Sequence, residues 1–130
     1  MVSQATWQAL EVDAFHGETE VDYSIIYTQH ENGLVIAWCG CDFNSQLDVI
    51  LTGLKLKKVS EVHKAVDAWV LLGEEVLDCF WPKEVSRDIL HDFEFGSMLA
   101  APSVDQIMAD KKIKLAFWHK WSKLWEKLTV

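Results

Sequence analysis

The chain has 130 residues, of which 50% are hydrophobic and 25% are charged, and this composition excludes an intrinsically disordered protein and predicts one domain, residues 1–130. The formal net charge of −8 argues against direct binding of nucleic acid, because contacts with phosphate require a cationic surface. No apolar run approaches the ~18 residues that a transmembrane helix needs.

The first part of the chain shows the period-two alternation of half-buried strands. Residues Leu10–Ala14 alternate apolar and acidic side chains. After His16-Gly17 the alternation resumes, with one face formed by Val21, Tyr23, Ile25 and Tyr27. Strands are therefore predicted over both segments.

Asn32-Gly33 lies between two of these strand-like segments. Asn-Gly is typical of a two-residue type I′ hairpin turn, because both central positions of that turn need positive φ. The resulting antiparallel hairpin is predicted to oppose Tyr27 to Trp38. The same register opposes Ile26 to Cys39.

Residues 47–58 are compatible with a strand or a helix. Leu54 and Leu56 alternate with lysines, which favours a strand, and Gly53 would weaken a helix interior by ~1 kcal/mol. The alternative is a helix, because apolar residues also recur at helical spacing at Leu47, Ile50, Leu51 and Leu54. We predict a strand here.

The second half is predicted to be mainly helical. Ser60 is a candidate N-cap for a helix that ends before Pro82 and is divided near Gly73. A short helix from Lys83 to about Phe93 follows, since its apolar residues recur four apart at Val85, Ile89 and Phe93. Ser103-Val104-Asp105-Gln106 then has the capping-box pattern and introduces a last helical region, interrupted near Asp110.

Residues 111–128 form an amphipathic segment. At helical spacing one arc collects Ile113, Phe117, Trp118, Trp121, Leu124, Trp125 and Leu128. We expect this arc to cover a sheet face. The alternatives are a helix at a membrane interface, a helix that docks in a partner's groove, or a short strand over Ile113–Phe117. Together the elements predict an α+β domain, with an antiparallel sheet from the N-terminal half covered by helices from the C-terminal half.

Carboxylates are grouped at helical or strand spacing. Glu18, Glu20 and Asp22 would stand ~6.6 Å apart on one strand face. Glu84, Asp88 and Asp92 would line one face of a helix, four residues apart. These six residues are the predicted partner-binding set. A third group contains Glu74, Glu75 and Asp78.

Charge is unevenly distributed along the chain. Residues 111–130 hold six lysines and one glutamate, a net charge of +5, whereas residues 1–110 hold six basic residues and nineteen acids, a net charge of −13. Charge of this size controls partners and association rates. We predict that the acidic part of the chain binds a basic protein. The alternative is that the C-terminal lysines of the same chain neutralise it.

No catalytic signature is found in the sequence. It lacks a phosphate-binding glycine loop, H-E-x-x-H and G-x-S-x-G, and its histidines accompany no positioned nucleophile. Trp38-Cys39-Gly40 is similar to the thioredoxin active site over three residues, but Cys39 and Cys41 have the wrong spacing for that site. We therefore predict no catalytic residue, no metal site and no cofactor.

The three cysteines are an odd number that predicts a reducing compartment. The N-terminal residues Met1–Trp7 lack the basic and apolar regions of a signal peptide. Both observations predict a cytoplasmic protein.

The predicted function is binding and neutralisation of a basic protein, as an inhibitor or immunity protein, with a nuclease toxin as the concrete target. In size, acidity and aromatic content the chain is similar to bacterial immunity proteins and protein inhibitors of nucleases, although it shares no motif with them. One alternative is a small-molecule-binding domain or minor enzyme with a tryptophan-lined pocket. Another is a peripheral membrane or helix-docking role of residues 111–128.

Overall fold

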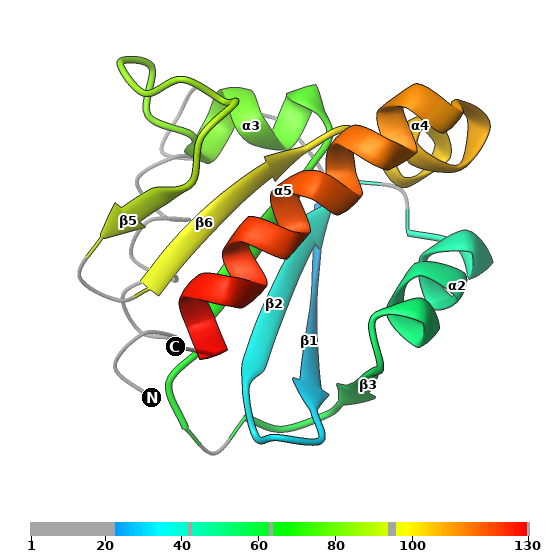
Figure 1. Ribbon diagram of the computed structural model, residues 1–130, viewed down its shortest axis with the longest axis vertical. Helices are drawn as coiled ribbons and strands as arrows, with labels where there is room; N and C mark the ends of the chain where they lie inside the picture. Colours follow the sequence, from blue (N-terminus) through cyan, green and yellow to red (C-terminus); the bar gives the residue numbers. More distant parts are fainter. Residues whose placement is uncertain (1–22, 42, 63, 94–95, 130) are drawn as a thin grey trace.

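A computed structural model describes residues 23–41, 43–62, 64–93 and 96–129 (Figure 1). The predicted strand at Leu10–Ala14 lies outside these residues, as does the predicted carboxylate row Glu18, Glu20 and Asp22. The elements in chain order are β1 (Ser24–His30), β2 (Val35–Gly40), α2 (Ser45–Gly53), β3 (Leu56–Val59), β4 (Ala68–Leu72), α3 (Glu74–Phe80), β5 (His91–Phe93), β6 (Gly96–Ala101), α4 (Val104–Ala109) and α5 (Lys111–Thr129).

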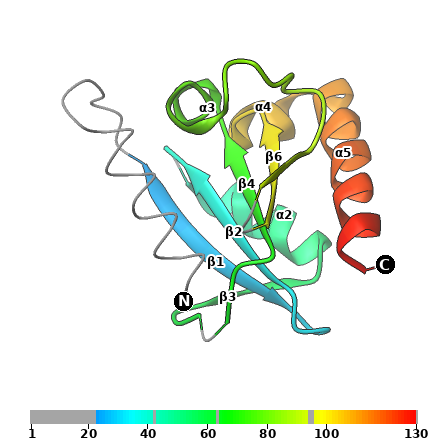
Figure 2. The ribbon, with the colours of Figure 1, turned by 90° about the vertical axis from the view of Figure 1, so that its left-hand side faces the viewer.

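The strands form one six-stranded sheet in the order β3-β1-β2-β4-β6-β5. Helices α2, α4 and α5 cover one face, and α3 packs on the other (Figures 1 and 2). This arrangement confirms the α+β prediction. The sheet is mixed rather than antiparallel throughout, because β2, β4 and β6 run parallel.

The central strand β4 explains the parallel pairing. All five of its residues are buried, and a strand covered on both faces has a continuous apolar sequence of the kind that parallel sheets use. The helix predicted to begin at Ser60 is therefore wrong before Gly73: Ala68–Leu72 is a strand, the described residues from Ser60 to Asp67 are not helical, and Ser60 caps no helix. The predicted break at Gly73 is confirmed, since this residue has φ of 95° and precedes α3.

Residues 83–90 do not form the predicted helix. They make turns, and β5 follows at His91–Phe93. Val85 packs toward the core beside α3, whereas Ile89 is 58% exposed. A four-residue apolar spacing occurs here without a helix because the side chains do not share one buried face. The strand β6 was not predicted at all.

The hairpin between β1 and β2 is confirmed, but its register differs from the predicted one by one residue. His30 N–H donates to Leu34 O and Gly33 N–H donates to His30 O, so the loop has three residues, Glu31–Gly33. Gly33 alone in this loop has positive φ, 95°, as in a type I turn followed by a left-handed glycine.

The extra loop residue changes which side chains are opposed. Ile26 is opposite Trp38, and Tyr27 is opposite Ala37. Tyr27 and Trp38 consequently lie on different faces of the sheet. Tyr27 packs edge-on against Trp69, with ring centroids 6.2 Å apart.

Residues 45–53 are helical, which corrects the strand predicted over 47–58. The Asn44 side chain accepts a hydrogen bond from Gln46 N–H at 2.9 Å and caps α2. Gly53 is the last helical residue, where it costs little. The strand prediction holds only for β3, Leu56–Val59, after Lys55 reverses the chain with φ of 60°.

The capping box is confirmed at Ser103 and Gln106, and α4 ends before Asp110 as predicted. Helix α5 then runs from Lys111 to Thr129, so the alternative strand over Ile113–Phe117 is excluded. Its buried residues Phe117, Trp121 and Leu124 belong to the core beneath it, as expected of a helix that covers a sheet. Within the described ranges, none of the helices has both the length and the apolar character needed to span a bilayer.

A buried polar pair lies in the core under α5. Trp38 Nε1–H donates to Thr28 Oγ1 at 3.0 Å, and the Thr28 hydroxyl donates to Ile36 O at 2.9 Å. Neither Thr28 nor Trp38 is exposed to solvent. The pair ties β1 to β2 where Trp38 stacks on Trp121, with ring centroids 5.7 Å apart.

Replacing Thr28 by Val is expected to lower the free energy of unfolding by about 1–3 kcal/mol, because the Trp38 N–H would lose its acceptor while remaining buried. Urea denaturation followed by tryptophan fluorescence measures this loss. Thr28→Ser keeps the hydroxyl and is the matched control, expected to lose less. Equal stability of Thr28→Val and the wild type would contradict the assigned role.

Candidate functional site

A crevice of about 310 Å³ opens at the carboxyl ends of the parallel strands. Its walls come from the segments that follow β2, β4 and β6: Gly40 and Phe43, Leu72–Glu75, and Ser103–Gln106. These segments are far apart in sequence and meet only because their strands are parallel neighbours.

The crevice exists because the chain leaves neighbouring strands in opposite directions. After β2 it enters α2 on one face of the sheet, and after β4 it enters α3 on the other. A parallel sheet at such a point leaves a gap outside its strand ends, which is where sheets of this kind commonly bind ligands.

Two glycines shape this gap. A Cβ on Gly40 would lie 2.8 Å from Phe43 Cε1, so glycine lets the phenyl ring pack against the end of β2. Gly73 turns the chain from β4 into α3 with φ of 95°, a conformation that side chains disfavour. Together they bring the start of α3 close to the end of β2.

The side chains around the crevice carry one sign of charge. Glu74, Glu75 and Asp105 line it, and no lysine, arginine or histidine is among the described residues of its lining. Within the described residues, none of these three carboxylates forms an ion pair. Asp105 Oδ1 accepts a hydrogen bond from Asn44 Nδ2 at 3.0 Å.

Four carboxylates elsewhere in the described chain are neutralised by basic side chains. Ion pairs join Asp48 to Lys58, Asp67 to Lys64, Asp78 to Arg87 and Asp92 to Lys127. Among the described residues, the crevice is thus a place where three carboxylates converge and no basic side chain lines the cavity. Glu74, Glu75 and Asp105 also lie in the first turns of α3 and α4, where the helix dipole favours negative charge.

The predicted row Glu84, Asp88 and Asp92 does not form one helix face. Glu84 and Asp88 are exposed in the turns before β5, and Asp92 lies on β5 itself. Asp92 accepts a hydrogen bond from Ser97 Oγ at 2.7 Å and pairs with Lys127. The lysines of α5 thus lie against part of this row.

Lys120 is the second lysine of α5 near the row. Its Nζ donates to Arg87 O at 2.8 Å and to Ala100 O at 3.2 Å, which ties the turns before β5 to α5 and β6. Burial lowers the pKa of Lys120, and the nearby Asp88 carboxylate acts in the opposite direction. Sequence reasoning missed this residue because its environment comes from three separate segments.

The lowered pKa of Lys120 predicts a pH dependence of stability. The folded state binds a proton at this site less readily than the unfolded state, so the free energy of unfolding rises with pH between the folded and unfolded pKa values. This gain is complete above the unfolded pKa of ~10.4 and absent well below the folded one.

Lys120→Met is therefore expected to be less stable near neutral pH, since both hydrogen bonds are lost, and to lack the alkaline gain of the wild type. Urea denaturation between neutral pH and about pH 10.4 compares the slopes. Lys123→Met, at an exposed position of the same helix, is expected to keep the wild-type slope. An unchanged slope in Lys120→Met would contradict the assignment.

The described residues contain no cluster of three or more His, Cys, Asp or Glu side chains that could hold a metal ion. Cys39 is buried in β2, Cys41 lines the crevice, and Cys79 is on α3. The polar side chains that line the crevice are three carboxylates, the Ser103 hydroxyl and the Gln106 amide, and their oxygens can accept hydrogen bonds from a cationic group.

Sequence reasoning noted Glu74 and Glu75 as an acidic group and Asp105 within a capping box, but it did not bring them together. The available indication was a fully apolar run, Ala68–Leu72, followed by glycine and two acids. That order is typical of a buried parallel strand that leads into a helix.

No protein-family model, curated protein or solved structure matches this chain. The function is consequently argued from the geometry and charge of the crevice.

Proposed function

We propose that this protein binds a basic protein and that the crevice receives a lysine or arginine side chain of that partner. The observation that carries the proposal is the convergence of Glu74, Glu75 and Asp105 around a cavity whose lining, as far as the described residues go, has no basic side chain. Desolvated charge pairs at the centre of an interface contribute strongly to specificity.

A long basic side chain fits the chemistry of the crevice. Phe43 and Leu72 contribute apolar surface to it, against which the methylene stem of lysine or arginine packs while its charged end reaches carboxylates. A guanidinium group additionally forms paired hydrogen bonds with a carboxylate. An amine or guanidinium on a flexible stem is thus favoured over a bare metal ion.

The overall charge of −8 supports rapid association with a basic partner, because opposite fields steer diffusional encounter. A protein whose own function is to hold a phosphate backbone presents such a basic surface. The proposed activity is therefore inhibition or immunity, by occupation of the basic groove of a nuclease-type toxin or another nucleic-acid-binding protein. The odd number of cysteines favours the cytoplasm as the place of this encounter.

The six carboxylates Glu18, Glu20, Asp22, Glu84, Asp88 and Asp92 remain candidates for the outer contacts of the same partner. Asp92 is the weakest of the described three, since Lys127 already neutralises it. Contacts at an interface rim act mainly on association rate and its salt dependence.

Glu74→Lys combined with Glu75→Lys is expected to reduce recovery of a basic partner by about tenfold or more, because like charges would face the bound lysine or arginine. A pull-down from native lysate at low and high salt, quantified by mass spectrometry, measures this recovery. The wild type is expected to enrich basic proteins at low salt and to lose part of them at high salt.

Asp48→Lys combined with Glu61→Lys, at two exposed positions outside the crevice, changes the net charge by the same amount and is the control, expected to keep most of the recovery. Charge reversal in the two carboxylate rows is expected to slow association with the partner, and to reduce its recovery less than reversal in the crevice does. Wild-type recovery by the Glu74→Lys, Glu75→Lys variant would refute the assignment of the crevice. Absence of any salt-dependent basic partner would refute the function.

A further inference from the structure

A second surface lies on the face of the sheet that carries α2 and α5. Both helices pack against α4 at one end and diverge toward the other (Figure 1). We call the surface between them the α2–α5 seam, and define its uncharged part by Gly53, Leu54, Trp118, Trp121 and Trp125. Phe43, which also lines the crevice, borders the seam at its α4 end.

Trp118 joins the two walls of the seam. Its indole ring lies against Gly53, where a Cβ would stand 3.6 Å from Trp118 Cη2. Below this contact the seam opens into a groove of about 480 Å³ between the end of α2, the β1–β2 hairpin and α5. The groove is separate from the crevice, since the two share no lining residue.

Stacked aromatic rings stiffen the wall of this groove. Trp121 stacks on the buried Trp38 and, on its other side, on Trp125, with centroids 5.7 Å and 6.0 Å apart. The His30 ring packs edge-on against Trp125, with ring centroids 4.6 Å apart. The groove is therefore preformed by core packing rather than by flexible surface side chains.

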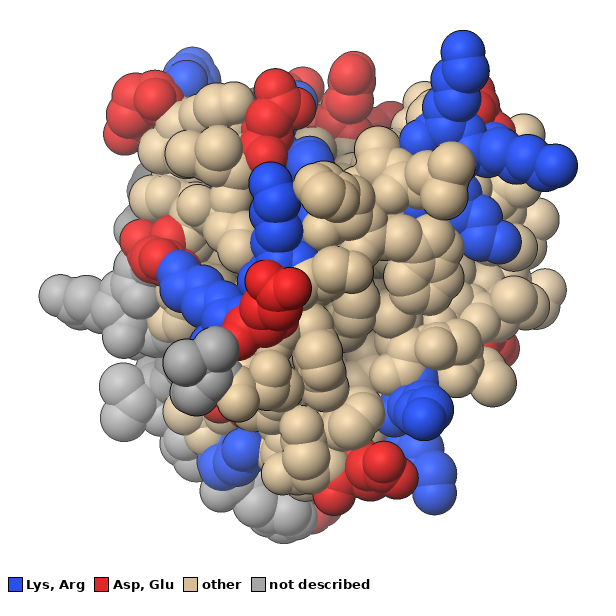
Figure 3. Space-filling model, in the orientation of Figure 1, with Lys and Arg blue, Asp and Glu red and all other residues tan. Residues whose placement is uncertain are grey.

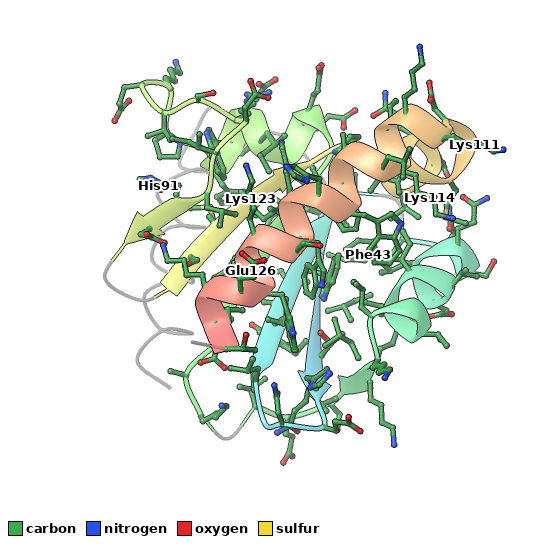
Figure 4. The ribbon with its side chains drawn as sticks, viewed as in Figure 1. Phe43, His91, Lys111, Lys114, Lys123 and Glu126 are labelled. Carbon is green, nitrogen blue, oxygen red and sulfur yellow. The ribbon has the colours of Figure 1, made fainter. Side chains whose placement is uncertain are left out.

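The two ends of the seam carry opposite charge. Lys111 and Lys114 lie at the α4 end, and Figure 4 shows them on α5 with Phe43 between α5 and α2. At the groove end the lining includes two carboxylates, Glu31 and Glu126, and one lysine, Lys55, which leaves that end net negative. Figure 3 shows a broad uncharged surface between these ends.

The lysines at the α4 end are costly to the protein itself. They occupy the first turn of α5, where a helix N-terminus disfavours positive charge, and the Asp110 carboxylate, which accepts a hydrogen bond from Lys112 N–H at 2.8 Å, offsets part of this cost. Within the described part of the chain, neither Lys111 nor Lys114 has an ion-pair partner. Acidic groups of another molecule would pair with these two lysines.

We propose that the α2–α5 seam docks an amphipathic helix of a protein partner. A helix fits because the seam is walled by two helices on one sheet face, and the apolar face of a third helix can lie over the seam and pack against side chains of both. Its apolar side chains at i, i+4 and i+7 would contact the tryptophans, as in other grooves that bind helices.

Charge complementarity sets the direction of the bound helix. The positive N-terminal end of a helix dipole, with basic residues, is placed at Glu31 and Glu126, and the acidic C-terminal end at Lys111 and Lys114. The bound helix thus runs antiparallel to α5. Because Lys111 and Glu126 are separated by fifteen residues of helix, the docked segment is about 15 residues long, or ~22 Å.

The probe is a stapled synthetic peptide of about 15 residues, with leucines on one face, lysines in its first turn and glutamates in its last. Fluorescence anisotropy of the labelled peptide is measured during titration with the full chain. This peptide is expected to bind about fivefold more tightly than versions with lysines or with glutamates at both ends.

Reversing the charge of the two lysines at the α4 end of the seam tests whether they bind the acidic end of the docked helix. Lys111→Glu combined with Lys114→Glu is expected to reverse the preference, so that the peptide with lysines at both ends becomes the better ligand. This reversal cannot arise from loss of folding, because it is a gain of affinity.

Ser122→Arg tests the groove by filling it. Ser122 lines the groove and its hydroxyl bonds only to Trp118 O of the preceding turn, so the variant is expected to fold normally and to bind the mixed-charge peptide about tenfold more weakly. Ile89→Arg is the matched control, because Ile89 is a 58% exposed hydrophobic residue outside the seam. It is expected to bind like the wild type.

Several outcomes would overturn the proposal. Equal binding of a scrambled peptide, or wild-type affinity of Ser122→Arg, would show that the seam is not a helix site. Binding to vesicles with anionic lipid without binding to any peptide would assign the surface to a membrane. A dimer in sedimentation that Ser122→Arg abolishes would assign it to a second copy.

The seam and the crevice are tested separately. Glu74→Gln combined with Glu75→Gln is expected to leave peptide affinity unchanged, and Ser122→Arg is expected to leave recovery of a basic partner unchanged. Failure of either proposal therefore leaves the other standing.

Discussion

Burial of β4 on both faces is the constraint on which the rest of this structure depends. A strand whose five residues are all buried needs neighbours on both sides and cover above and below. Its parallel pairing with β2 and β6 requires crossovers, and the crossovers carry α2 to one face and α3 to the other. The crevice at the strand ends and the divergence of α2 from α5 are both consequences of that packing.

The fold decides which charged side chains of this protein neutralise one another. Several acids are neutralised by basic side chains, some from a nearby segment, as Asp78 by Arg87, and another from a distant segment, Asp92 by Lys127. Around the crevice three carboxylates have no such neighbour among the described residues. Net charge alone does not locate an acidic surface, whereas the ion pairs identify four described carboxylates that are already neutralised.

Prediction from the sequence succeeded where a short motif specifies its own geometry. The capping box at Ser103 and Gln106 formed as predicted because both partners lie within one helical turn. Amphipathic spacing located α5, and Gly73 located the break before α3. The same reasoning failed for Ala68–Leu72, because a short buried strand and a buried helical segment have the same apolar composition, and only neighbouring strands distinguish them.

By itself the sequence determined the α+β class, the hairpin around Asn32-Gly33, the start of α4 and the apolar face of α5, since each depends on residues close together in the chain. Tertiary structure alone decided the parallel direction of the central strands and the register of the hairpin. It also decided that lysines of α5 bind Asp92 and the turns before β5, and that Glu74, Glu75 and Asp105 lie around one crevice. The reason is physical. Periodicity records which face of a segment is apolar, but strand direction and charge pairing depend on segments that are remote in sequence and become neighbours only when the core is packed.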